Sequence, residues 1–84
     1  MDMDSPATAL SYPAIAMIFE DVFQHTDALT AETSPDSVER WDSLQHIALI
    51  RTLEITFDIQ LSMDEMMEIR SVGDIENVLR RHGV

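Results

Sequence analysis

The sequence contains no cysteine, two glycines and three prolines among its 84 residues. Without cysteine, the chain can form neither a disulfide framework nor a thiolate metal site. Scarce glycine and proline favour helices over a sheet with many tight turns. A chain this short builds one hydrophobic core. We therefore expect a single domain over residues 11–84. Residues 1–10 have no periodicity, so we expect a flexible leader there.

Lysine is absent too, so five arginines face sixteen acidic residues, and the formal net charge at pH 7 is −11. Such a surface repels nucleic-acid phosphates and anionic membranes and favours basic protein partners, although solubility alone would also explain it. The N-terminus has no signal-peptide pattern, and no apolar run has membrane-spanning length. We therefore expect a cytoplasmic protein that binds neither nucleic acid nor membrane. Nothing in the sequence requires more than a monomer.

The first predicted helix begins near residues 11–13, where a capping side chain and the first-turn Pro13 are both tolerated. It ends near His25. Its apolar residues recur at helical spacing and form one stripe, made of Ile15, Ile18, Phe19, Val22 and Phe23.

A polar loop follows, from about Thr26 to Trp41. A loop of this length is unusual in so small a domain unless it is functional. Ser34 and Pro35 can start one short turn within it. Leu29 and Val38 can pin the loop to the core.

The second predicted helix runs from about Ser43 to Phe57, because Asp42 and Gln45 have the spacing of a capping box. On a helical wheel, two opposite arcs of this helix are apolar. The inward arc consists of Leu49, Ile50, Leu53 and Phe57, and the outward arc consists of Leu44, Ile47, Ala48 and Ile55 around Arg51. An apolar outer face on a helix of a small domain indicates a docking surface.

Two further helix starts are predicted. Ser62 and Glu65 have capping-box spacing and open a short helix that ends near residue 68 or 69. Ser71 opens a last helix that stops at Gly83. The inward stripe of this last helix consists of Val72, Ile75, Val78 and Leu79. The sequence thus predicts an all-α fold, a small four-helix bundle with three main helices, one short third helix and a long loop between the first two.

The start of the second helix carries the informative motif, Asp42-Ser43-Leu44 between Trp41 and His46. After such a loop, this motif resembles the phosphopantetheine attachment site of acyl and peptidyl carrier proteins of the discrete bacterial type. Three further segments are similar to that family: residues 29–43, Leu53-Glu54 with Phe57-Asp58-Ile59, and residues 71–75. The resemblance extends over about residues 15–82 and implies an acyl-carrier-like fold.

The resemblance implies that Ser43 carries a covalent 4′-phosphopantetheine arm, taken from coenzyme A, with Asp42 and Leu44 in the cofactor site. The chain would then be a non-catalytic carrier whose arm holds an acyl group as a thioester. Implied partners are a phosphopantetheinyl transferase, an acyl- or aminoacyl-loading ligase or transferase, and downstream enzymes of fatty acid or polyketide biosynthesis. Two alternatives stay open: an aminoacyl or peptidyl carrier loaded by an adenylating ligase, and an unmodified acidic helical adaptor.

The residues around Ser43 agree with a modified serine. A serine in the first turn presents its hydroxyl at the end of the helix, clear of the core. A phosphodiester formed there lies near free backbone N–H groups and the positive end of the helix dipole. Asp42 adds an opposing negative charge, and the resemblance implies that it helps the transferase and its magnesium ion engage the site.

Partner-binding residues are expected on the outer face of the second helix and on the short helix, namely Leu44, Ile47, Ala48, Arg51, Met66 and Met67. For the methionines at 63, 66 and 67, filling the core is favoured over contact with cargo or partners. Carriers of bacterial fatty acid synthesis usually have a strongly acidic second helix. Here residues 43–57 contain a single acidic residue, Glu54, and a single arginine, Arg51. This difference favours a dedicated carrier for a polyketide, a peptide or a specialised acyl group.

No catalytic or metal site is predicted. A hydrolase triad of Ser43, His46 and Asp42 is not favoured, because no glycine-rich elbow or second donor segment supplies an oxyanion hole. Asp42 is expected to cap the helix, and His46 to anchor the preceding loop. Trp41 is expected to pack that loop onto the bundle as a hydrophobic staple. The three histidines lie on different elements and share no metal-ligand spacing with carboxylates.

Overall fold

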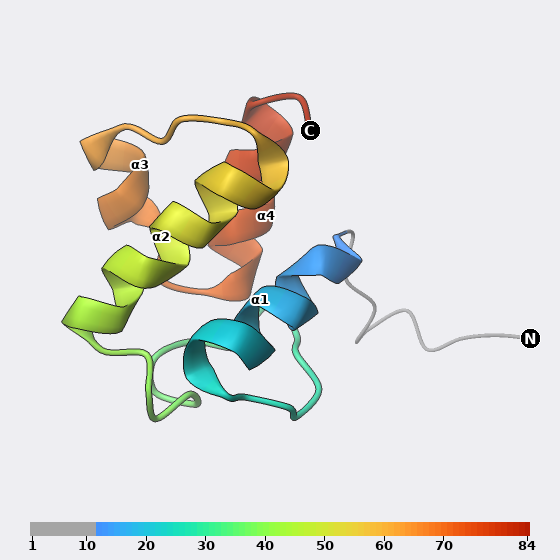
Figure 1. The fold of residues 1–84 in the computed structure, drawn as a ribbon, viewed down its shortest axis with the longest axis vertical. Coiled ribbons are helices and arrows are strands. Elements are labelled where there is room, and N and C mark those ends of the chain that lie inside the picture. The colour runs from blue at the N-terminus through green and yellow to red at the C-terminus, as the bar shows by residue number, and fades with distance from the viewer. Residues whose placement is uncertain (1–11) are drawn as a thin grey trace, which may run out of the picture.

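The computed structural model describes residues 12–84 and folds them into helices joined by loops (Figure 1). The helices are α1 (Pro13–Phe23), α2 (Ser43–Phe57), α3 (Met63–Glu68) and α4 (Val72–Arg81). The predicted all-α fold, with three main helices and a short third one, is confirmed. The leader predicted over residues 1–10, and Ser11 with it, lie outside the described residues.

Helix α1 packs its predicted apolar stripe into the core, where all of the stripe except the half-buried Val22 is buried. Pro13 is its first residue, and Tyr12 at the N-cap forms no side-chain capping hydrogen bond. The predicted end near His25 is wrong, because Gln24 adopts a left-handed backbone conformation with φ of 51° and ends the helix after Phe23. A left-handed residue cannot continue a right-handed helix.

Helix α2 has the predicted bounds. The carboxylate of Asp42 accepts a hydrogen bond from the Gln45 backbone N–H at 2.8 Å, which fixes the start of the helix. Leu49, Ile50 and Leu53 are buried as predicted. Phe57 is only half-buried, because it lies at the end of the helix, where its ring meets Tyr12 edge-on at 5.8 Å between centroids.

The long loop over residues 24–42 is packed and hydrogen-bonded. Leu29 and Val38 are buried in the core, and a turn begins at Ser34, whose carbonyl accepts from the N–H groups of residues 37 and 38. The loop also caps α4, since the Thr33 and Ala31 carbonyls accept from the first two N–H groups of that helix, at 2.9 Å each. These donors have no partner within the helix, so the loop satisfies them and is fixed in place.

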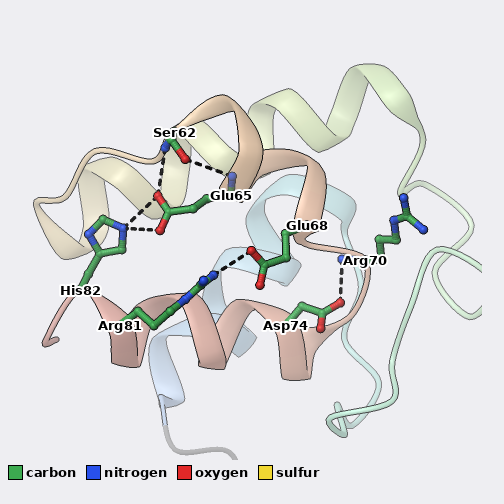
Figure 2. A network of polar contacts seen from close by, with 7 residues as sticks. All are labelled: Ser62, Glu65, Glu68, Arg70, Asp74, Arg81 and His82. Atoms are coloured by element: carbon green, nitrogen blue, oxygen red, sulfur yellow. Dashed lines mark hydrogen bonds and ion pairs between the residues drawn. The ribbon is translucent and has the colours of Figure 1, made fainter.

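Helices α3 and α4 begin at the predicted caps. Ser62 and Glu65 form a reciprocal capping box, and the Ser71 hydroxyl accepts from the Asp74 N–H. Two acids of α3 face the basic end of α4, as Figure 2 shows: Glu65 pairs with His82 at 3.0 Å and Glu68 with Arg81 at 2.8 Å. Gly83 follows in a left-handed conformation and ends the chain's last turn as predicted.

The core lies among α1, α2, α4 and the long loop. Its buried apolar residues are Ile15, Ile18, Phe19, Phe23, Leu29, Val38, Trp41, Leu49, Ile50, Leu53, Ile69, Val72, Ile75, Val78 and Leu79. Helix α3 contributes none of them and contacts the core through the half-buried Met66. Within residues 12–84, no helix has the length and hydropathy that crossing a bilayer requires.

Candidate functional site

Ser43 is the first residue of α2, and its side chain is exposed. The Asp42 carboxylate, at the N-cap, accepts a hydrogen bond from the Gln45 N–H within this first turn. The serine hydroxyl therefore lies at the end of a helix whose start is fixed by its cap. The predicted exposure of this hydroxyl, clear of the core, agrees with the structure.

An open groove of about 450 Å³ borders Ser43. Its lining residues come from the end of the long loop, the first turn of α2 and the segment between α3 and α4: Pro35, Trp41, Asp42, Ser43, His46, Ile69 and Arg70. Trp41 and Ile69 belong to the core and give the groove an apolar wall. Asp42 and Arg70 add one charge of each sign at its rim.

Trp41 and His46 join the loop to α2 and α3. The Trp41 indole N–H donates to His46 Nδ1 at 2.9 Å, and the two rings are stacked with an interplanar angle of 13°. Because the indole N–H can only donate, Nδ1 accepts and the other ring nitrogen carries the hydrogen. Nε2–H then donates to the Met66 carbonyl at 2.9 Å. The predicted roles of Trp41 and His46 in anchoring the loop are confirmed. Trp41 lies immediately before the N-cap and His46 is the fourth residue of α2, which are the two positions of a hydrophobic staple.

The same contacts leave His46 unsuited to activate Ser43 as a nucleophile. Both of its ring nitrogens are engaged, one by Trp41 and one by Met66. Asp42 contacts the backbone of Gln45 and is not the acid that orients the imidazole. Among residues 12–84, no group of three or more histidine and acidic side chains is arranged to hold a metal ion.

The outer face of α2 is apolar and open. Leu44 is 76% exposed, Ile47 50% and Ile55 81%, and Arg51 lies exposed among them. Ala48 is half-buried. Exposed apolar side chains in one stripe are uncommon on a small soluble domain and indicate a contact surface.

The three methionines of α3 differ in whether they fill the core or remain available for contact with cargo or partners. Core filling is wrong for Met63 and Met67, which are 66% and 64% exposed. It holds in part for Met66, which is half-buried against the core. The helix has six residues, so it turns only one side toward the core and leaves the other methionines in solvent.

Arg70, Ile69 and Pro35 are groove residues that the sequence did not indicate. Arg70 lies immediately before the N-cap of α4, in a segment without periodicity. Only the fold of the segment between α3 and α4 brings it beside Ser43. Its charge in a chain with few cations is the one sequence feature that sets it apart.

Residues 14–79 match the family model for the phosphopantetheine attachment site. An acyl carrier protein of Clostridium acetobutylicum is 42% identical over 41 residues, which are 49% of this chain and 53% of that protein. The match thus covers about half of that curated relative.

Two solved structures are similar over most of the chain. The solution structure of a holo acyl carrier protein from Geobacter metallireducens has a TM-score of 0.73 and 35% identity, covering 81% of this chain and 79% of that one. A candidate acyl carrier protein from Mycobacterium tuberculosis has the same TM-score at 28% identity, covering 81% of this chain and 92% of that one.

Proposed function

The chain belongs to the phosphopantetheine-attachment-site family, and we propose that Ser43 bears the arm and that the arm carries an acyl group between biosynthetic enzymes. Proteins of this family are non-catalytic carriers with covalently attached 4′-phosphopantetheine, and a phosphopantetheinyl transferase modifies them. For this chain, we propose the attachment residue, the cargo and the partners. The exposed Ser43 hydroxyl at the fixed start of α2 is the observation that carries the proposal.

Attachment requires the Ser43 oxygen to attack the coenzyme A phosphorus that bears the pantetheine. A new O–P bond forms, the bond from that phosphorus to the adenosine bisphosphate leaving group breaks, and the serine proton passes to a base of the transferase or to water. When bound, the arm supplies a terminal thiol that holds the cargo as a thioester, a group that this cysteine-free chain otherwise lacks. The groove beside Ser43 has an apolar wall and a cation, which fit the alkyl and phosphate parts of the arm.

Two neighbours of Ser43 have proposed roles in modification. Asp42 holds the first turn of α2 in place and presents a negative charge beside the hydroxyl, suited to the magnesium ion of the transferase. Leu44 is 76% exposed directly after Ser43 and is suited to contact the transferase. The partner surface then continues over Ile47, Ala48 and Arg51 to the exposed Met67, with the half-buried Met66 at its edge.

Intact mass spectrometry tests the attachment residue. The chain is incubated with coenzyme A and a broad-specificity phosphopantetheinyl transferase, alongside the variants Ser43→Ala and Ser37→Ala. Ser37 is a matched control because it is also an exposed serine, in the long loop. We expect one added phosphopantetheine on the chain and on Ser37→Ala, and none on Ser43→Ala. Absence of the addition, or its persistence in Ser43→Ala, would contradict the proposal.

The cargo is tested by loading the modified chain. We expect acyl groups to be loaded as hydroxylamine-labile thioesters, consistent with an acyl carrier. If an adenylating ligase loads the chain with amino acids and acyl donors do not load it, the aminoacyl or peptidyl carrier would be favoured. An unmodified adaptor predicts instead that Ser43→Ala retains full activity in the native host.

A further inference from the structure

Two arginines of this acidic chain have no side-chain partner among the described residues. Three others are engaged: Arg40 with Gln24, Arg80 with Asn77 and Arg81 with Glu68. The guanidinium groups of Arg51 and Arg70 form no hydrogen bond or ion pair within residues 12–84. For Arg70, only the backbone N–H contacts Asp74, at 3.0 Å, and Figure 2 shows its guanidinium directed away from that carboxylate. An unpaired cation in so acidic a chain is available to an external anion.

Arg70 differs from Arg51 because it lines the groove beside Ser43. The groove also has an apolar wall whose residues are fixed in the core, since Trp41 is 4% exposed and Ile69 2%. The hydrogen bond from Trp41 to His46 also prevents the indole from turning away. At about 450 Å³, the groove is in the size range of sites for small molecules.

We propose that this groove is a docking site for the arm itself, in which Arg70 binds the phosphodiester and the apolar wall contacts the gem-dimethyl segment that follows it. The inference rests on attachment at Ser43. A group bonded to the Ser43 oxygen begins at the rim of the groove, so its local concentration there is high without any further binding energy. A guanidinium binds a phosphate by charge-assisted hydrogen bonds.

The negative charge of Asp42 would disfavour a phosphodiester in the groove unless a cation offsets it. Its carboxylate lines the same groove and repels a neighbouring phosphodiester. The Gln45 N–H partly offsets that charge, and Arg70, from the segment between α3 and α4, adds a positive charge to the same groove. Because Arg70 is exposed, its ion pair with the phosphate is weak. The free energy needed to release the arm from the groove to a partner enzyme is therefore small.

The test compares the modified forms of three proteins: the unaltered chain, Arg70→Gln and Arg51→Gln. Arg51→Gln is the matched control, because it removes the other unpaired arginine, which does not line the groove. Mass spectrometry first establishes that each protein carries the arm on Ser43. Two-dimensional NMR then measures nuclear Overhauser effects between the arm's methyl protons and the Trp41 indole. The intensity of these effects measures the fraction of docked arm, and the indole signals are unambiguous because Trp41 is the single tryptophan of the chain.

We expect methyl-to-indole effects on modification of the unaltered chain and of Arg51→Gln. In Arg70→Gln the ratio of docked to free arm should fall roughly two- to fivefold, the range of a solvent-exposed ion pair. Raising the salt concentration should have the same effect without any substitution. Absence of the methyl-to-indole effects in the modified chain, or equal behaviour of the two arginine variants, would overturn the docking site. A chain that takes up no arm would instead contradict the proposed function.

Discussion

The Trp41 indole N–H and His46 Nδ1 are 2.9 Å apart, and this hydrogen bond joins the end of the long loop to the first turn of α2. His46 continues the connection to α3 through the Met66 carbonyl, also at 2.9 Å. One side chain thus links the three segments around Ser43. The position of the serine depends on these contacts as well as on the Asp42 cap.

Replacing this imidazole should destabilise the fold. In His46→Ala, the Trp41 N–H and the Met66 carbonyl lose their partners, at a cost of about 1–3 kcal/mol in the free energy of unfolding. Urea unfolding monitored by Trp41 fluorescence measures the loss. Gln45→Ala is the control, because the Asp42 cap uses the backbone N–H of Gln45 and not its side chain. A loss in His46→Ala no larger than in Gln45→Ala would show that the two hydrogen bonds contribute nothing net.

The two faces of α2 should respond differently to truncation. Leu53 is 1% exposed and Ile55 is 81% exposed, although they are two residues apart on the same helix. Leu53→Ala should lower the free energy of unfolding by about 2–5 kcal/mol, because it removes buried methyl groups and leaves a cavity. Ile55→Ala should change it by less than about 0.5 kcal/mol. Similar losses in the two variants, measured by urea unfolding, would mean that the outer face is covered in solution.

Acid should weaken the attachment of α3. The backbone N–H of Ser62 and then the ring of His82 hold the pKa of Glu65 below the usual range of a glutamic acid. A carboxyl with a lowered pKa stabilises the fold above its usual pKa, and this contribution is lost as the pH falls through the folded-state value. The loss should therefore begin as the pH nears the usual pKa of a glutamic acid, about 4.3, and be complete once the pH lies below the lowered folded-state pKa.

The variant Glu65→Gln isolates this contribution. Its amide oxygen can still accept from the Ser62 N–H, but it no longer titrates. As the pH is lowered from neutrality through this range, the free energy of unfolding of Glu65→Gln should fall less than that of the unaltered chain. Asp64→Asn is the control, an exposed acid on the same helix whose carboxylate contacts nothing among the described residues. Parallel pH curves for the chain and Glu65→Gln would refute the prediction.

The helix starts could be predicted because their signals are local. A capping side chain and the backbone N–H that donates to it lie three residues apart, so Asp42, Ser62 and Ser71 identify their helices without knowledge of the fold. The end of α1 could not be predicted as well. Gln24 adopts a left-handed conformation that glycine usually marks, so nothing in the sequence indicated it.

The site divides in the same way. Ser43 and the roles of Trp41 and His46 follow from residues close together in the chain. The position of Arg70 follows from how the segment between α3 and α4 folds against α2, which no spacing encodes. The preference for core filling was wrong for Met63 and Met67 because a helix of six residues is too short for periodicity to define a buried face.

Arg51 lies on the surface that we propose for partner contact. It is exposed on the outer face of α2, between Ile47 and Ile55, and has no side-chain partner within residues 12–84. The only acid of that helix, Glu54, is half-buried and accepts from the Leu61 N–H at 2.9 Å. A partner on this face therefore meets apolar side chains and one positive charge. Arg51→Glu should lower kcat/KM for modification by the transferase by roughly three- to tenfold, about 0.7–1.4 kcal/mol of lost interaction.

The fold should be unaffected by this substitution, because an exposed side chain without partners changes stability by less than about 0.5 kcal/mol. Thermal unfolding of Arg51→Glu should therefore match that of the unaltered chain. Arg80→Glu is the control for net charge, since it changes the total charge equally but lies on α4. An equal decrease in kcat/KM for the two variants would assign the effect to overall charge, whereas a large fall in the melting temperature of Arg51→Glu would mean that this side of α2 is not the partner surface.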